Sequence, residues 1–131
     1  MKQFNVGIKG VVRRKDGAVL LLRKNQDDTF WDVPGGRIDG DESIEQTLNR
    51  ELSEELPGIQ DIRIGKILCA YRLQKDIALD TSLALVYYEV TAVLPDPVQL
   101  SDEHNEYCWV SSLDQAALGD GTREALMALF S

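Results

Sequence analysis

Residues 31–59 read WDVPGGRIDGDESIEQTLNRELSEELPGI, and this stretch decides the fold. It opens with a glycine turn, because Gly35 and Gly36 follow Pro34 after an apolar and aromatic run. Two adjacent glycines allow backbone angles that a side chain would forbid, and they let another group approach the main chain closely. The stretch therefore places an accessible backbone directly before the helix that is predicted next.

That helix is predicted from its caps and its apolar spacing. Ser43 and Gln46 have the capping-box spacing, in which each side chain satisfies one unpaired backbone N–H. Pro57 disfavours helical geometry at the residue before it, and Gly58 suits the left-handed residue beyond a helix end. We therefore predict a helix over residues 44–55. Apolar side chains recur every four residues and form one face, at Ile44, Leu48, Leu52 and Leu56.

Three glutamates of this helix lie where a charge is costly. At about 100° per residue, Glu51 and Glu55 border the apolar row, and Glu54 follows Glu51 at the i,i+3 spacing. Carboxylates about 6 Å apart repel by roughly 3 kcal/mol at an effective dielectric of about 20. The negative end of the helix dipole adds to this cost. A solvated glutamate-rich face would account for Glu54 alone, but Glu51 and Glu55 together favour a site for a hard cation such as Mg²⁺ or Mn²⁺.

The same residues resemble the signature of the Nudix hydrolases, G-x5-E-x7-R-E-U-x-E-E-x-G-U, in which U is aliphatic. Gly36 is followed after five residues by Glu42, and seven more lead to the run Arg50-Glu51-Leu52-Ser53-Glu54-Glu55. The end of the motif departs from the signature, because Leu56-Pro57-Gly58-Ile59 carries one extra residue. This departure alters the exit from the helix and leaves the acids in place.

The resemblance implies a Mg²⁺-dependent reaction, with Mn²⁺ as the alternative ion, in which water attacks phosphorus in a nucleoside diphosphate linked to another group. A divalent ion suits this chemistry because it neutralises phosphate charge and lowers the pKa of water. By position, Arg50 is expected to orient a glutamate, Glu42 to hold the loop or the surroundings of the metal, and Gly36 and Glu42 to line the substrate site. The implied metal ligands are the Gly35 carbonyl, Glu51, Glu54 and Glu55, and the implied catalytic residues are Arg50, Glu51 and Glu54.

Composition limits the partners of this chain. Its 131 residues predict one domain, spanning residues 1–131. The net charge of −8 argues against a nucleic-acid polymer or an anionic membrane as partner, but not against a small nucleotide that arrives with Mg²⁺. Cys69 and Cys108 form no cluster, so we predict free or buried thiols in a reducing cytoplasm, with a disulfide as the less favoured alternative. No signal peptide or membrane-spanning apolar run is recognised, and homodimer formation is left open.

The rest of the chain predicts a mixed sheet between helices. Gly121 and Thr122 are expected to cap a last helix that runs through Phe130, and residues 111–114 to start a short helix. With the helix over residues 44–55 on one face and the last helix on the other, the fold class is α/β, a Nudix-type α/β/α sandwich. Alternating or β-branched runs predict strands, of which residues 82–88 form a central one, over residues 4–12, 18–22, 62–73, 79–93 and 107–110.

Two further segments carry candidate site residues. Arg23 ends a predicted strand just before the loop that leads to the glycine turn, and contact with a substrate phosphate or with solvent is equally expected. The resembled family often has an acid before a Trp-Val strand that reaches the metal site. Glu103 is the first choice for this catalytic acid and Glu106 the second. His104, the single histidine, is interpreted as a surface residue, with acid–base work as the alternative.

The aromatic residues are interpreted mainly as packing groups. Phe30 and Trp31 are expected in the core or in the wall of a cleft rather than as a platform for base stacking. Tyr71, Tyr87 and Tyr88 are expected to pack on the sheet, with lining of a pocket as the alternative.

The resemblance finally suggests a reaction. The W-x-x-P-G-G opening and the small size are similar to the MutT-type subgroup, which hydrolyses nucleoside triphosphates to monophosphate and pyrophosphate. An ADP-ribose or other nucleotide-sugar substrate is the alternative, although Gln74 lies near the place where the ADP-ribose subgroup has a proline. The P-K-G opening of the dinucleoside polyphosphate subgroup is absent from the sequence. A binding module without turnover is a further alternative, but such modules usually lose motif acids that this chain retains.

Overall fold

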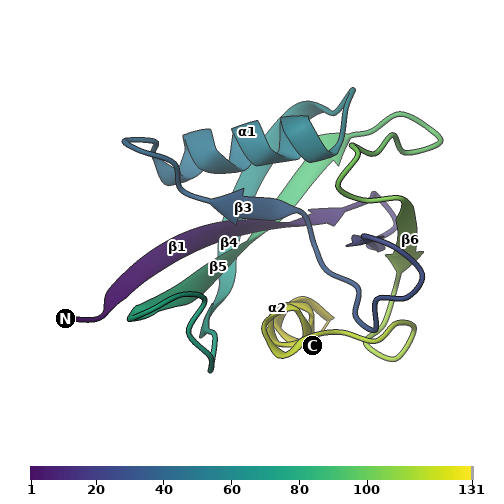
Figure 1. Cartoon of the computed structure of the whole chain (residues 1–131). Coiled ribbons are helices and arrows are strands. Elements are labelled where there is room, and N and C mark those ends of the chain that lie inside the picture. The colour runs from purple at the N-terminus through teal and green to yellow at the C-terminus, as the bar shows by residue number, and fades with distance from the viewer. Residues whose placement is uncertain (131) are drawn as a thin grey trace.

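A computed structural model describes residues 1–130 and places a six-stranded mixed sheet at the centre of the molecule (Figure 1). The strand order is β4-β5-β1-β2-β6, and β3 pairs with β1. The sheet is mixed because β1 and β5 run parallel while the other pairs are antiparallel. The elements are β1 (Gln3–Arg13), β2 (Val19–Arg23), β3 (Gly35–Arg37), α1 (Ile44–Glu55), β4 (Gln60–Arg72), β5 (Thr81–Val93), β6 (Glu106–Val110) and α2 (Asp120–Phe130).

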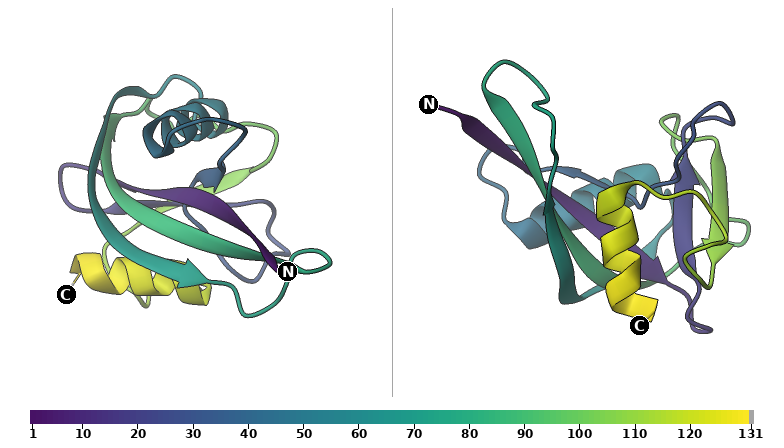
Figure 2. Two further views of the ribbon diagram at one scale, coloured as in Figure 1. Left: turned by 90° about the vertical axis from the view of Figure 1, so that its left-hand side faces the viewer. Right: turned by 90° about the horizontal axis from the view of Figure 1, so that it is seen from below.

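The two helices cover opposite faces of the sheet, as Figures 1 and 2 show. Alternate residues of a strand point to opposite faces, so Leu20 and Leu22 pack in one core with α1, and Val19 and Leu21 pack in a second core with α2. This arrangement confirms the predicted α/β/α sandwich. No helix formed by residues 1–130 is long and apolar enough to cross a membrane.

Helix α1 begins and ends where its sequence predicted. Ser43 caps the first turn, and both hydrogen bonds of the capping box with Gln46 are present. Leu48, Leu52 and Leu56 are fully buried. Ile44, the first residue of the helix, is less buried than these leucines, and 41% of it is exposed.

Strand β3 was not predicted, because its glycine-rich sequence indicated only a turn. Its three residues pair antiparallel with residues 7–9 of β1, and Gly35 lies opposite Lys9. Gly35 has a φ of 148°, and a Cβ there would overlap the carbonyl oxygen of Ile8. The glycine is therefore required both by its backbone angle and by the closeness of β1. The pairing fixes the Gly35–Gly36 backbone beside α1.

The prediction of a short helix starting at residues 111–114 is wrong, because these residues form bends and turns instead. The Ser112 hydroxyl donates to the Asp114 carboxylate at 2.6 Å, and Gln115 accepts from the backbone N–H of Ser111. Polar side chains of this kind offer the backbone an alternative to helical hydrogen bonds. The turn leads to Leu118, which forms a bridge with Trp31 before α2 begins at Asp120.

Candidate active site

The last turn of α1 holds a buried carboxylate. Glu55 is only 4% exposed, and its Oε2 accepts a hydrogen bond of 2.8 Å from the backbone N–H of Gly35. The pKa of Glu55 is raised to about 7, chiefly by burial and to a smaller extent by the nearby acids Glu51 and Glu103; the Gly35 hydrogen bond and the Lys9 ammonium offset part of this rise. The sequence predicted that this acid borders the core, and the structure buries it more completely than a border position would.

Glu51 lies one turn earlier, against the glycine backbone. Its side chain is 15% exposed, and a Cβ on Gly36 would overlap its carboxylate. The second glycine of the turn therefore leaves the space that this carboxylate occupies. Arg50 donates to Glu51 Oε1 at 2.8 Å, so the orientation of the acid is held from the other side.

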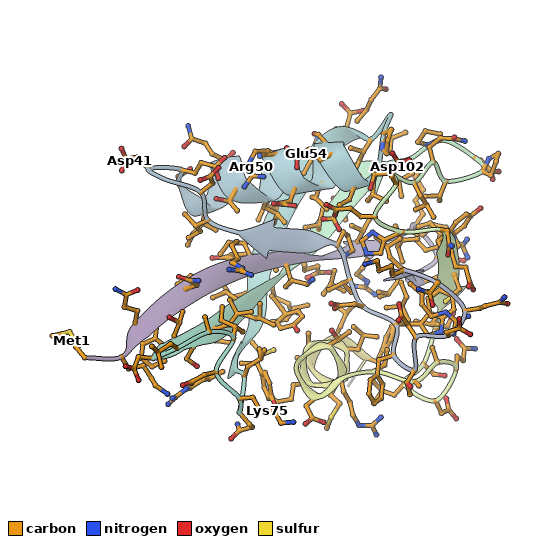
Figure 3. All side chains as sticks on the ribbon, viewed as in Figure 1. Met1, Asp41, Arg50, Glu54, Lys75 and Asp102 are labelled. Carbon is orange, nitrogen blue, oxygen red and sulfur yellow. The ribbon has the colours of Figure 1, made fainter. Side chains whose placement is uncertain are left out.

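Arg50 connects the acids of the motif. It forms two hydrogen bonds with Glu42, of 2.7 and 3.0 Å, and donates to the backbone carbonyl of Arg37 at 3.2 Å. The pKa of Glu42 is lowered to about 2, chiefly by its hydrogen bonds from Arg50. Glu54 is more exposed, at 60% of its side chain, and lies 3.5 Å from Arg50. Figure 3 shows Arg50 and Glu54 on α1, with Asp102 of a later loop near the C-terminal end of the helix.

The loop before β6 brings two more ligand-type side chains to Glu55. The backbone N–H of Ser101 donates to the Glu55 carbonyl at 3.2 Å, which ties the loop to the end of α1. Ligand atoms of Glu55, Glu103 and His104 all lie within 4.8 Å of one another. The structure thus places the first-choice loop acid, Glu103, in this group.

His104 was expected at the surface, and this expectation is wrong. Only 19% of its side chain is exposed, and Nδ1 lies 3.7 Å from Glu55 Oε1. Nδ1 is buried and has no hydrogen-bond partner among residues 1–130. Burial lowers the pKa of this imidazole. The single histidine followed an acidic run, which is an ordinary surface pattern, so the sequence contained no local signal of its burial.

Glu106, the second-choice acid, lies elsewhere. Its Oε2 accepts from Arg23 at 2.7 Å, across the paired strands β2 and β6. The Arg23 guanidinium also lies over the Trp31 ring, 4.3 Å from its centroid. Arg23 is therefore engaged by a carboxylate and an aromatic face, and Trp31 packs at the edge of the second core.

A cleft of about 330 Å³ opens on the α2 side of the sheet. Aromatic side chains supply much of its wall, and Phe30 is 57% exposed there, as the wall interpretation predicted. Of the three tyrosines for which lining of a pocket was the alternative, Tyr88 packs in the α1 core, whereas the other two line the cleft. The aromatic residues of the cleft are Phe30, Trp31, Tyr71 and Tyr87.

Lys9 and Asp32 form a polar link between the cleft and the acids. Asp32 lines the cleft, and its Oδ1 accepts from the Thr122 hydroxyl at 2.8 Å. Its Oδ2 accepts from Lys9 Nζ at 3.2 Å, and only 12% of the Lys9 side chain is exposed. Lys9 was not predicted as a site residue, although a lysine inside the otherwise apolar run of residues 8–12 indicated one.

These side chains fit a divalent cation. A carboxylate that is 4% exposed, a neighbouring acid and an imidazole converge within 4.8 Å, and the imidazole Nδ1 has no hydrogen-bond partner in the described part of the chain. Buried charges of one sign are tolerated when they are paired or coordinate a metal. Glu55 and Glu103 could hold such an ion, with Glu51 and the Gly35–Gly36 backbone adjacent.

Known proteins share this α/β/α sandwich. The family model described as the NUDIX domain matches residues 2–129. The chain therefore belongs to the NUDIX domain family, which confirms the resemblance of residues 36–55.

Individual relatives agree with the family. The chain is 28% identical to a MutT NUDIX hydrolase from Burkholderia pseudomallei, whose crystal structure superposes with a TM-score of 0.76 over 97% of this chain and 98% of that one. A crystal structure of a MutT protein from Methanosarcina mazei Go1 is 26% identical, with a TM-score of 0.76 over 98% and 94%. A Mycobacterium tuberculosis protein provisionally named 8-oxo-dGTP diphosphatase 2 is 32% identical over 64% of this chain, which spans about half, 55%, of that relative.

Proposed function

We propose that this protein is a divalent-metal-dependent pyrophosphohydrolase that converts a nucleoside triphosphate to the monophosphate and pyrophosphate. The observation that carries the proposal is the continuity between the acids and the cleft. Glu55 lies near Lys9, Lys9 bonds Asp32, and Asp32 lines an aromatic cleft of about 330 Å³. A base in the cleft would therefore direct its phosphates towards the acidic end of α1.

The chain's own residues would divide the work as follows. Glu51, Glu55 and Glu103 would hold the divalent ion, with the Gly35 carbonyl and the more exposed Glu54 beside them. When bound, the ion supplies positive charge for the phosphates and lowers the pKa of water. Glu54 is exposed enough to take a proton from water, and Arg50 keeps Glu51 and Glu42 in place through charge-assisted hydrogen bonds. Gly36 leaves room for the Glu51 carboxylate, and Lys9 would contact phosphate.

Arg23 is a weaker candidate for phosphate contact than the sequence indicated. Its guanidinium already bonds Glu106 and covers Trp31, so using it for phosphate would break both interactions. Lys9 bonds a half-exposed Asp32 and lies nearer the acids, so it replaces Arg23 as the proposed phosphate contact.

The names of relatives support a triphosphate substrate. Besides the 8-oxo-dGTP diphosphatase name, a Haemophilus influenzae protein named dihydroneopterin triphosphate diphosphatase is 26% identical over 82% of this chain and 75% of its own length. Both names describe a diphosphatase that acts on a triphosphate. An aromatic cleft suits the flat ring of a nucleobase.

The test is a substrate panel with Mg²⁺ or Mn²⁺. It contains nucleoside triphosphates, oxidised nucleotides, ADP-ribose and nucleotide sugars, and the products are separated so that pyrophosphate is distinguished from phosphate. We expect release of pyrophosphate from at least one triphosphate. If ADP-ribose or a nucleotide sugar released two monophosphates while no triphosphate was hydrolysed, the substrate would instead belong to that class. Binding without turnover of any member would indicate a sensing module.

Variants of the acids connect the reaction to the site. Glu51→Gln and Glu55→Gln preserve size and remove one negative charge each, so we expect turnover to fall at least about a hundredfold while the fold is retained. Glu45→Gln is a matched control, because this glutamate lies in the first turn of the same helix. Equal turnover of the two acid variants and the wild type at saturating metal would contradict the assigned roles.

A further inference from the structure

The geometry around His104 carries an inference about the metal itself. Glu55 uses Oε2 to accept from Gly35, which leaves Oε1 facing His104 Nδ1 at 3.7 Å. This separation is too long for a hydrogen bond. Nδ1 has no hydrogen-bond partner within residues 1–130, although it is buried. The pair therefore leaves a carboxylate oxygen and an imidazole nitrogen facing each other across a gap that neither atom closes.

A cation would satisfy both atoms at once. Ions such as Zn²⁺ lie about 2.0–2.2 Å from nitrogen and carboxylate oxygen ligands, so two ligands of one ion are at most about 4.3 Å apart. The 3.7 Å separation lies within this limit, and a carboxylate oxygen of Glu103 belongs to the same group of atoms within 4.8 Å. His104 Nδ1 and Glu55 Oε1 are therefore spaced as two ligands of one ion, and Glu103 is close enough to join them after a small shift of its side chain.

We propose that His104 Nδ1 coordinates a divalent ion together with Glu55 and Glu103, and that this nitrogen makes the site prefer a first-row transition ion over Mg²⁺. The proposal rests on the metal site of the proposed function and specifies its selectivity. Mg²⁺ takes oxygen ligands almost exclusively, whereas transition ions accept imidazole. Affinity for a nitrogen-containing site then rises from Mn²⁺ to Cu²⁺ and is lower again for Zn²⁺.

The sequence makes this proposal easy to test, because the chain contains a single histidine. Pulsed EPR of tag-free protein loaded with Mn²⁺ reports nitrogen nuclei bound directly to the ion. In this protein a coordinated imidazole nitrogen can come only from His104. We expect the nitrogen signal in the wild type and its loss in His104→Gln and His104→Asn.

Affinity gives a second, independent measurement. Loss of a partner in the surroundings of a metal typically weakens binding about 10–100-fold. We therefore expect His104→Gln to weaken Mn²⁺ binding at least about tenfold and to change Mg²⁺ binding less than about twofold. If His104 only formed a hydrogen bond to Glu55, the asparagine variant, which keeps a polar atom near the place of Nδ1, would restore affinity. That rescue would overturn the proposal.

Other outcomes also decide the matter. Saturating Mn²⁺ without a directly bound nitrogen, or no Mn²⁺ binding, would overturn the proposal, and the wild-type spectrum alone is sufficient if a variant does not fold. Turnover is measured on the same samples, so that the two proposals fail separately. A nitrogen signal without turnover would support the ligand and remove the proposed reaction, whereas turnover without a nitrogen signal would remove His104 alone.

Discussion

The burial of Glu55 predicts that the acid destabilises the metal-free protein. Its pKa of about 7 in the fold lies above the ordinary value of 4.5. Between these two pH values the folded protein keeps a proton that the unfolded chain releases. The free energy of unfolding therefore falls as pH rises from about 4.5 to about 7, and this contribution is constant above pH 7. At about 1.4 kcal/mol for each pH unit, the full effect is about 3 kcal/mol.

Glu55→Gln removes this cost while keeping the contacts of the side chain. The amide oxygen can still accept from the Gly35 N–H, and the amide N–H faces His104 Nδ1, which accepts no hydrogen bond from residues 1–130. We expect the variant and the wild type to be about equally stable at pH 4.5 without metal. At pH 8 the variant is expected to be more stable by up to about 3 kcal/mol.

Denaturant unfolding in the presence of a chelator measures both free energies across this pH range. Glu54→Gln is the matched control, because it removes a carboxylate from the same turn at a position where 60% of the side chain is exposed, and it shows whether the effect belongs to the buried acid. Added divalent metal is expected to stabilise the wild type and not Glu55→Gln, because an ion that binds only the folded state raises its stability. A stability difference between Glu55→Gln and the wild type that is the same at pH 4.5 and pH 8 would refute the reasoning.

Three more substitutions test the surroundings of this acid. Gly36→Ala places a Cβ against the carboxylate of Glu51, so turnover is expected to fall at least about tenfold at a stability cost of about 1 kcal/mol; unchanged turnover would show that the close approach has no role. Arg50→Lys cannot reproduce the paired hydrogen bonds to Glu42, and kinetic assays are expected to show about a tenfold loss of kcat with the fold preserved by circular dichroism. Lys9→Met is expected to raise KM for the triphosphate about tenfold with little change in metal affinity, and a loss of metal affinity alone would contradict a phosphate contact.

Much of the fold followed from patterns that are local in the chain. The capping box of Ser43 and Gln46 and the burial of Leu48 and Leu52 depend on residues three or four apart, which a helix brings together by its own geometry. The long strands were recognised in the same way, because alternation along a strand is also a local property. Strand β3 was missed, since three glycine-rich residues become a strand only when β1 lies beside them.

The sequence by itself determined the presence and spacing of the acids on α1, because the motif is continuous and the helix sets their directions. Only the tertiary structure decided which of them is buried, and which distant groups meet it. Glu55 contacts the Gly35 backbone 20 residues earlier, and His104 approaches it from the loop before β6. Such contacts leave no repeating pattern in the sequence, because they depend on how the sheet, the helix and the loop pack together.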